Sequence, residues 1–297
     1  GVDLSPSGRA RWALGSLIRV AGLSGALPAG LRERLRTLPT RAEIQALAAY
    51  DAILANSEYS RRWVRHYWHR ESQVLYPPID RLQPGIKKNI ILHVGRFFVG
   101  GHNKKHDVLV DAFRALLARL PAGESWELHL AGSITPGDEH QRYADRIREL
   151  AAGLPVRIHH GIDHPALAAL FGRARIYWHA TGYGADLRRH PDQAEHFGMS
   201  IAEAMSAGAV PVVYAEGGPA EIVTPGRDGL VWRTPEALVD DTLDLIRQPE
   251  RQAVMAAAAA ARSRDFETRA FMRQARALWD RIMRQHPADT MALPHDR

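Results

Sequence analysis

The sequence contains no cysteine among its 297 residues. This absence excludes disulfide bonds, thiolate zinc sites and catalysis by a cysteine nucleophile. The longest apolar stretch, residues 253–261, is far shorter than the roughly 20 residues that a membrane-spanning helix needs. No secretory signal pattern opens the chain, which begins with Gly1 rather than Met. We therefore expect a cytoplasmic protein and a fragment of a longer chain.

Several catalytic and metal-binding signatures are missing as well. The fifteen histidines form no His-Glu-x-x-His pair, so we predict no metal site and no cofactor. No Gly-x-Ser-x-Gly elbow is present, which argues against a serine nucleophile. What remains is an ordinary globular composition, with 45% hydrophobic and 24% charged residues.

Positive charge is concentrated at the start of the chain. The whole sequence carries a net charge of +6, and residues 1–41 hold seven arginines against two acids. Leu14, Leu17 and Ile18 recur there at helical spacing. Such a basic amphipathic helix can lie on an anionic membrane surface, and the alternative is a solvated face that packs on a missing neighbour. No helix-turn-helix, zinc-finger or RNA-binding signature accompanies the charge, so we expect no nucleic-acid partner.

From residue 89 onward, apolar runs alternate with stretches of helical periodicity, which is typical of βαβ units and a parallel sheet. The runs are rich in Val, Ile and Leu, as in strands that are buried on both faces. The fold class predicted is therefore α/β, a Rossmann-like parallel sheet flanked by helices. The expected strands are residues 90–97, 126–131, 156–160, 176–180, 210–214 and 230–232. The expected helices are residues 107–120, 141–152, 165–173, 199–207, 235–247, 250–264 and 267–284.

The region before residue 89 is incomplete. Residues 52–56 resemble a lone strand, residues 59–68 a helix, and residues 74–80 an extended linker with two prolines. One strand cannot make a sheet, so we infer that most of a preceding domain is absent. The predicted organisation is a remnant of that domain plus linker at 1–80, the Rossmann-like domain with a C-terminal helix at 81–284, and a frayed tail at 285–297.

A basic, glycine-rich loop follows the first strand of the Rossmann-like domain. Gly95, Arg96, Gly101, Lys104 and Lys105 lie in it. Ligands of doubly wound sheets bind beyond the carboxyl ends of the strands, and these residues would suit a diphosphate there. The loop matches neither the Walker A nor the Gly-x-Gly-x-x-Gly pattern, and an ordinary basic surface loop is the alternative.

Two glutamates, Glu195 and Glu203, stand eight positions apart across a loop-to-helix junction. The residues between them would open the helix and leave free N–H groups that attract a phosphate. Carboxylates can accept hydrogen bonds from the vicinal hydroxyls of a sugar or ribose. The alternative is a helix-start acid together with a solvated or salt-bridged glutamate. The candidate binding residues of this junction are His196, Phe197, Gly198, Met199 and Ser200.

A third region combines a predicted strand at residues 210–214 with the glycine pair Gly217-Gly218 and a short helix. This order puts a further backbone nest near the same crevice.

Taken together, residues 50–284 resemble the C-terminal part of a family 4 glycosyltransferase, a retaining nucleotide-sugar enzyme of GT-B architecture. Glu195 and Glu203 match the family's pair of glutamates separated by seven residues, within a Glu-x-Phe-Gly-x-x-x-x-Glu-Ala-Met string. The Gly-x-x-Pro-Val-Val strand and the Gly-Gly-x-x-Glu-Ile-Val turn follow it. Val94-Gly95-Arg96 with a later lysine resembles the family's diphosphate-binding basic residues. Residues 50–57 and 76–80 resemble the end of the N-terminal domain and the interdomain linker.

The resemblance implies a role for each of these residues. Arg96 and Lys104, or Lys105 as the alternative, would neutralise the departing nucleoside diphosphate. Glu203 would hold the ribose, and Glu195 with the backbone of residues 196–200 would position the donor sugar and its phosphate. Residues 161–164 would contact the base. The donor would be a UDP- or GDP-sugar whose hexose is transferred with retention and without a metal.

The resemblance also implies a missing half. The acceptor-binding N-terminal domain is largely absent, so Phe271, Leu278 and Trp279 of the last helix would have lost their partner surface. We expect this chain alone to bind nucleotide and to transfer sugar poorly or not at all. The implied acceptor is a glycan or a lipid-linked glycan, reached in the cytoplasm or at the inner face of a membrane. The alternative is a non-catalytic nucleotide-sugar-binding module or a subunit of a split enzyme.

Overall fold

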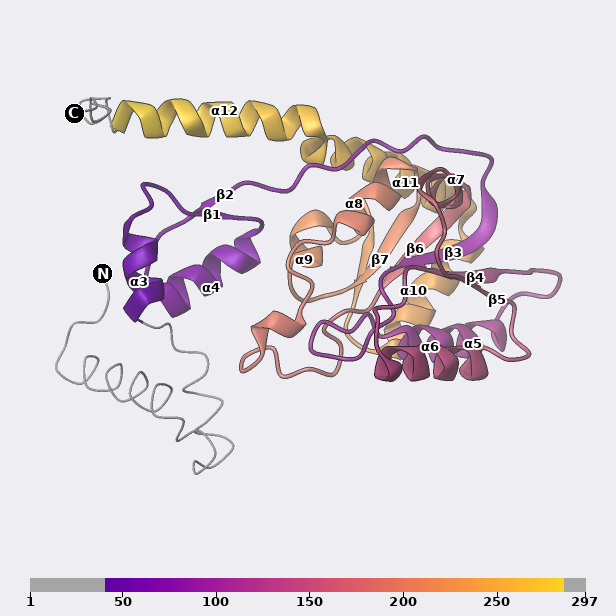
Figure 1. Cartoon of the computed structure of the whole chain (residues 1–297). Helices are drawn as coiled ribbons and strands as arrows, with labels where there is room; N and C mark the ends of the chain where they lie inside the picture. Colours follow the sequence, from indigo (N-terminus) through magenta and orange to yellow (C-terminus); the bar gives the residue numbers. More distant parts are fainter. Residues whose placement is uncertain (1–40, 286–297) are drawn as a thin grey trace, which may run out of the picture. The chain divides into compact units, whose positions relative to one another are not determined.

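The computed structural model describes residues 41–285 (Figure 1). The chain divides into two units, one made of residues up to Leu75 together with those from Arg273 onward, the other of Tyr76–Met272. The second unit thus begins a few residues earlier than the sequence-based boundary at residue 81, and the last helix is shared between the units. None of the described helices is both long and apolar enough to cross a membrane.

Tyr76–Met272 is built on a parallel sheet of six strands in the order β5-β4-β3-β6-β7-β8. This is the order of a doubly wound fold, in which the direction of winding reverses between β3 and β6. The predicted α/β, Rossmann-like class is confirmed. The strands are β3 Lys88–Val94, β4 Glu127–Ala131, β5 Val156–His159, β6 Ala174–His179, β7 Val210–Tyr214 and β8 Leu230–Trp232.

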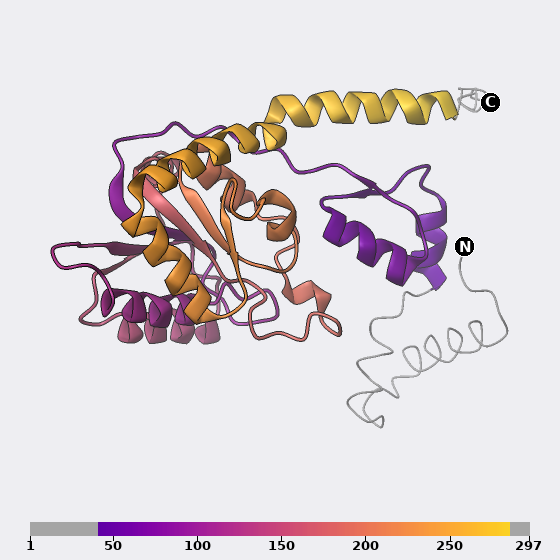
Figure 2. The same ribbon diagram turned by 180° about the vertical axis from the view of Figure 1, so that it is seen from behind.

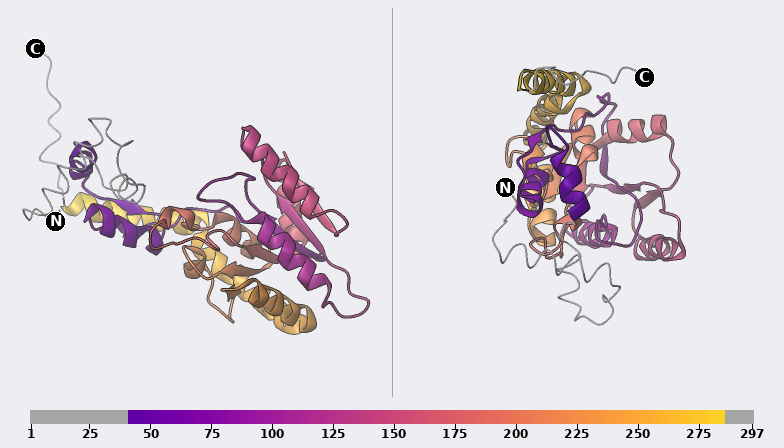
Figure 3. Two further views of the ribbon diagram at one scale, coloured as in Figure 1. Left: turned by 90° about the horizontal axis from the view of Figure 1, so that it is seen from below. Right: turned by 60° about the vertical axis from the view of Figure 1, so that its left-hand side comes forward.

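Helices cover both faces of this sheet, because alternate residues of the strands enter two separate cores. Ile91 belongs to one core, and its neighbours Ile90 and Leu92 belong to the other. The first core takes residues of α5, α6 and α10, and the second takes residues of α7, α8 and α9 (Figure 1). The view from behind shows the strands between the two sets of helices (Figure 2), as does the right-hand view of Figure 3. The helices are α5 His106–Leu117, α6 Asp138–Leu150, α7 His164–Arg173, α8 Met199–Ser206, α9 Pro219–Ile222, α10 Pro235–Arg247, α11 Pro249–Ser263 and α12 Thr268–Gln285.

The predicted elements agree with the observed ones except near their ends. One error is in β3, which was expected to run to residue 97 and ends at Val94. The chain leaves the sheet at Gly95, and Phe97 instead bridges Ile134 and is fully buried. An apolar residue beyond a strand was therefore mistaken for part of it, because it is buried by a loop rather than by the sheet.

The first unit contains more sheet than the sequence predicted. Its helices are α3 Arg41–Ala48 and α4 Glu58–Trp68, and the predicted strand is present as β1 Leu54–Ala55. This strand is not alone: it pairs in parallel with β2 Gln73–Val74, whose second residue was assigned to the linker. The extended backbone ahead of the two prolines thus carries ladder hydrogen bonds. The basic stretch at 1–40 lies outside the described residues.

The half-buried Lys87 links the sheet to α8. The Lys87 ammonium donates hydrogen bonds of 2.7 Å to the carbonyl oxygens of Ala174 and Ala207. Ala207 is the residue after α8, so one of the unpaired carbonyls at the end of the helix is satisfied. Burial, with a smaller effect from Arg175, lowers the pKa of Lys87 from its ordinary 10.5 to about 8.

We predict that Lys87→Met destabilises the protein by about 1–3 kcal/mol, because two carbonyl groups lose their donor. The folded pKa lies below the unfolded one, so the unfolded chain binds more protons between about pH 8 and 10.5. The contribution of Lys87 to stability therefore rises with pH in this window. Denaturant unfolding of wild type and variant should show a larger difference at about pH 9.5 than at about pH 7.5. The adjacent exposed lysine supplies the control, since Lys88→Met should show neither effect.

Candidate functional site

The candidate site lies where the sheet reverses its winding. The loop at residues 95–105 follows β3, and the segment at residues 180–198 follows β6, which is the neighbour of β3 in the sheet. The carboxyl ends of both strands therefore open on the same crevice, where doubly wound folds bind ligands. Glu195 and Lys104 come from these two connections and meet.

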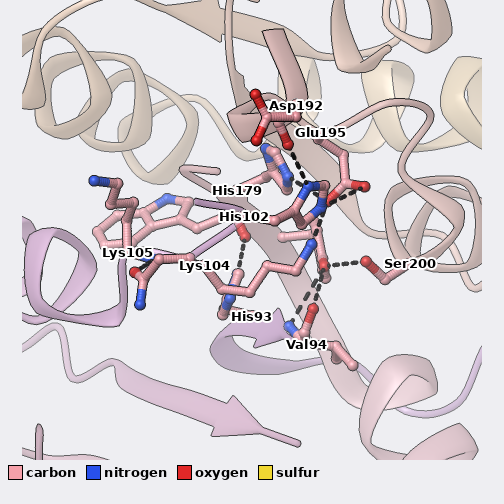
Figure 4. Close-up of polar contacts among 12 residues, drawn as sticks. His93, Val94, His102, Lys104, Lys105, His179, Asp192, Glu195 and Ser200 are labelled. Atoms are coloured by element: carbon pink, nitrogen blue, oxygen red, sulfur yellow. Dashed lines mark hydrogen bonds and ion pairs between the residues drawn. The ribbon is translucent and has the colours of Figure 1, made fainter. Parts of the chain in front are cut away.

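Glu195 is the centre of a cluster of nitrogen donors (Figure 4). Its carboxylate lies 2.5 Å from Nζ of Lys104 and 3.4 Å from Nε2 of both His102 and His179. Lys104 and His102 come from the glycine-rich loop, whereas His179 is the last residue of β6. The carboxylate thus joins three parts of the chain that are far apart in the sequence.

The electrostatics of this cluster favour the ionised carboxylate. Burial alone would raise the pKa of Glu195, but hydrogen bonds from His102 and His179 and the charge of Lys104 hold it well below its usual value. The pKa of His179 is lowered by burial, against the opposing effect of Glu195. At neutral pH Glu195 is therefore ionised and His179 is neutral.

The two lysines of the loop differ in direction, which the sequence left open. Lys104 points at Glu195, whereas Lys105 points away from the cluster (Figure 4). Lys105 is the residue before α5 and has a left-handed backbone with φ 57°. Its amide donates to the Asn103 side chain at 2.7 Å. Lys104 is therefore the lysine that the structure brings to the candidate site.

Arg96 leaves the end of β3 but does not join the cluster. Its guanidinium carbon lies 5.4 Å from the ring centroid of Phe98, in a cation–π contact. The residue is exposed, and in the described part of the chain it forms no ion pair. Arg96 is thus an available cation next to the crevice, held against an aromatic ring.

Glu203 differs from Glu195 in having no partner. It lies on α8, and burial raises its pKa, against the smaller effect of the charge of His164. Among the residues that the structure describes, none donates a hydrogen bond to its carboxylate or pairs with it. The Glu203 side chain is half-buried, and a partly desolvated carboxylate without a protein donor can accept hydrogen bonds from a ligand.

A buried tyrosine connects the neighbourhoods of the two glutamates. Tyr177 of β6 donates its hydroxyl proton to Oγ of Ser200 at 2.7 Å. Its pKa is raised by burial, and the charges of Glu195 and Glu203 both add to the increase. Both carboxylates therefore affect the same tyrosine, although Glu195 precedes α8 in the chain and Glu203 lies within this helix.

The segment from His196 to Ser200 fixes the start of α8. Gly198 precedes the helix with φ 108°, a conformation that favours glycine. Phe197 is buried and stacks on Tyr76 with centroids 5.5 Å apart, so its ring anchors the segment in the core. His196 is half-buried and meets His102 edge to face, and Met199 is 46% exposed. The backbone, the polar side chains and the exposed Met199 of this segment are thus open to a ligand.

The glycine pair packs directly against that segment. A Cβ on Gly218 would lie 2.4 Å from the carbonyl oxygen of His196, and one on Gly217 would lie 2.3 Å from that of Glu195. The amide of Gly218 donates to the same Glu195 carbonyl at 2.7 Å. This amide is therefore engaged within the protein, and the pair supports the Glu195 backbone rather than offering the expected open nest.

Other parts of the loop keep its shape. Gly95 lies beneath the Lys104 side chain, since a Cβ there would be 2.7 Å from its Cγ. Gly101 packs in the same way on the side chains of Asp192 and Gln193. Asn103 donates to the Phe98 carbonyl and accepts from the hydroxyl of Tyr143 at 3.3 Å.

Sequence reasoning assigned no role to His102, Asn103 or Tyr177. His102 lies in the glycine-rich loop at residues 95–105, but a histidine in a basic loop matches no distinguishing pattern. Tyr177 lies inside an apolar strand, where its hydroxyl gave no signal. His179 lies at the end of a strand and matches no motif, and the described residues contain no group of three or more acids and histidines that could hold a metal ion.

We predict that Gly218→Ala destabilises the protein by about 2 kcal/mol or more, because backbone atoms rather than a flexible side chain occupy the space of the new methyl group. Gly85→Ala is the matched control, since its methyl group would sit 3.5 Å from the backbone of Gly172, an ordinary contact. Thermal unfolding of both variants tests this. Equal unfolding temperatures would contradict the close packing described.

We predict that Glu203→Gln raises the unfolding temperature at pH 7. Burial holds the pKa of Glu203 above its unfolded value, so its ionisation favours the unfolded chain as pH rises through this range. The neutral amide removes this penalty. The gain should disappear at about pH 4, where the carboxyl group is protonated in the folded protein. A lower unfolding temperature at pH 7 would show that Glu203 has a stabilising partner.

Curated proteins of similar sequence are mannosyltransferases. The chain is 26% identical over 196 residues to the GDP-Man:Man(3)GlcNAc(2)-PP-Dol alpha-1,2-mannosyltransferase of Dictyostelium discoideum, covering 59% of this chain and 36% of that protein. It is 29% identical over 221 residues to a lipopolysaccharide core biosynthesis mannosyltransferase of Rhizobium meliloti (strain 1021), covering 70% and 58%. The chain thus spans only about a third to a half of these relatives.

Solved structures share the fold at low identity. An Anabaena protein, HepE, in complex with UDP and glucose superposes with a TM-score of 0.66 at 18% identity, covering 82% of this chain and 68% of that one. A glycosyltransferase from Rickettsia africae gives a TM-score of 0.66 at 16% identity, covering 83% and 68%. Residues 79–262, which span the sheet and both glutamates, match the family described as glycosyl transferases group 1. The chain therefore belongs to the group 1 glycosyltransferases.

Proposed function

We propose that the chain is the donor half of a retaining, family 4 type hexosyltransferase that uses a nucleotide-diphospho-sugar. The observation that carries the proposal is the contrast between the two glutamates. Glu195 is saturated by Lys104 and two histidines, whereas Glu203 is half-buried with no partner among the described residues. One carboxylate is used to build the site, and the other is left for a ligand.

Glu203 is suited to hold a ribose. Each carboxylate oxygen accepts hydrogen bonds, so one carboxylate can take both hydroxyls of a vicinal diol. These bonds would satisfy the group that burial now disfavours. His164 is close enough to Glu203 to affect its pKa, and it belongs to the loop at residues 161–164, which we propose contacts the base. Ribose and base would then lie beside each other.

Lys104 and Arg96 are suited to hold the diphosphate. Lys104 already lies at the crevice, and Arg96 is an unpaired cation that can leave Phe98 for a stronger charge. The start of α8 adds its backbone amides, which attract anions at a helix N-terminus. Positive charge around the departing diphosphate stabilises the transition state, because negative charge develops there as the glycosidic bond breaks.

Glu195 and the backbone of residues 196–200 would position the donor sugar. Retention would follow if the acceptor attacks on the face from which the diphosphate leaves, with a phosphate oxygen taking the acceptor's proton. That route needs only the leaving group and the cations described, so we propose that the reaction requires neither a metal nor a cofactor.

GDP-mannose is the donor that we propose, since the named curated relatives are mannosyltransferases and one of them uses GDP-Man. The acceptor would be a glycan or a lipid-linked glycan, bound partly by the residues that the chain lacks relative to those proteins. The chain alone should therefore bind nucleotide and transfer sugar poorly. A cytoplasmic location with contact to the inner face of a membrane fits a lipid-linked acceptor.

We predict that GDP binds the chain with 1:1 stoichiometry and that UDP binds at least tenfold more weakly, as measured by calorimetric titration. Glu203→Ala and Arg96→Ala should each weaken GDP binding at least tenfold, because each removes a charged hydrogen-bonding group from the nucleotide. Glu236→Ala and Arg142→Ala are matched controls on exposed helix surfaces and should bind as wild type.

The other outcomes are equally informative. Tighter binding of UDP would replace the mannose-type donor with a UDP-sugar and keep the site. GDP binding that survives both variants would reject the site itself. Nucleotide binding without transfer, after the missing domain is restored, would make the protein a non-catalytic nucleotide-sugar-binding module.

A further inference from the structure

A polar cavity lies near the last turn of α7, at the other end of this helix from the loop at residues 161–164. The sheet face that α7 covers is apolar over β3 but charged over β4 and the edge strand β5. Between these strands and the end of α7 is a cavity of roughly 590 Å³. Pockets for small molecules fall in this size range.

The cavity carries an excess of positive charge. Lys88, Arg157 and Arg173 line it, against the single carboxylate of Glu127. Arg157 pairs with both oxygens of Glu127 at 2.8 and 3.0 Å. Lys88 and Arg173 have no ion-pair partner in the described part of the chain. Two positive charges therefore face the cavity without compensation.

The floor of the cavity is a rigid hydrogen-bonded network. Glu127 accepts from Nε2 of His129 at 2.8 Å, and Nδ1 of His129 lies 3.1 Å from Nε2 of His159. The His129 side chain is only 7% exposed. Because its proton is on Nε2, His129 accepts at Nδ1 and His159 must donate. Hydrogen bonds from Arg157 and His129 lower the pKa of Glu127 to about 2, so Glu127 keeps its negative charge at neutral pH.

This cavity is separate from the proposed nucleotide site. The loop proposed to contact the base leads into the first turn of α7, whereas the cavity is lined by Leu170 and Arg173 from its last turn. The ten residues of this helix span about 15 Å. No residue lining the cavity belongs to the glycine-rich loop or to the segment at residues 195–203.

We propose that this cavity binds the phosphate or diphosphate group of a small soluble molecule, at a site distinct from the donor site. Lys88 and Arg173 contact the anion, and the Arg157–Glu127–His129–His159 network holds the floor. A group with two negative charges matches the two uncompensated cations. The volume exceeds that of a phosphate ion, so the rest of the cavity holds the organic part of the molecule.

The test uses pyrophosphate as the probe in an Arg96→Gln/Lys104→Gln/Glu195→Gln background, which removes the cations proposed to hold the nucleotide diphosphate and the carboxylate that Lys104 would otherwise leave unpaired. We expect calorimetric titration to show one pyrophosphate bound per chain. Adding Lys88→Gln and Arg173→Gln should weaken this binding at least tenfold. Adding Arg142→Gln and Arg146→Gln, which removes the same charge from exposed positions on α6, should leave it unchanged.

Histidine NMR gives a readout specific to the cavity. Burial, together with the neighbouring His129 and Arg157, lowers the pKa of His159. Bound pyrophosphate should raise it, and the Lys88/Arg173 variant should abolish the change. Equal binding by both double variants, or no pyrophosphate binding, would overturn the proposal. So would charge-dependent binding to phosphatidylglycerol vesicles without pyrophosphate binding, which would assign the cations to a membrane surface.

Discussion

The contact between Glu195 and Lys104 is the interaction on which the candidate site depends. This ion pair joins the loop after β3 to the segment after β6. These two segments lie where the winding of the sheet reverses. Both side chains are largely buried, so removing either one would leave an uncompensated charge, at a typical cost of 3–5 kcal/mol. His102 and His179 complete the coordination of the carboxylate from two further directions. The orientation of the lysine is therefore set before any ligand arrives.

The two glutamates therefore differ in their partners and in the direction of their pKa shifts. Glu195 is held ionised by its partners, and it in turn fixes a cation at the mouth of the crevice. Glu203 is held in an unfavourable environment that a ligand can relieve. Binding sites commonly retain such locally unstable groups, because the free energy lost in folding is recovered when the ligand provides the missing hydrogen bonds.

Much of this could be predicted from the sequence, and the remainder has physical reasons. The central strands such as β3 and β7 were found because they are runs rich in β-branched and aliphatic residues, most of them buried. The glutamates and the glycine pair were found because their spacing forms a family pattern. The choice between Lys104 and Lys105 depends on a left-handed backbone at Lys105, which no local pattern specifies.

The sequence also failed where a residue acts through distant partners. The supporting role of Gly218 depends on a segment some twenty positions earlier, and the burial of Phe97 depends on a loop after β4. The charged face over β4 and β5 was missed for a similar reason. Its residues come from separate strands, and each of them alone looks like an ordinary surface residue.

The packing of Gly217 and Gly218 against the Glu195 backbone has a consequence for how this fold can be recombined. The two segments are separated by α8 and β7 in the chain, yet they share one surface with no room for a side chain. A chimera that takes one segment from another group 1 enzyme, without the other, would pair surfaces that were not shaped together. The segments around residues 195–197 and 217–218 should therefore be exchanged together.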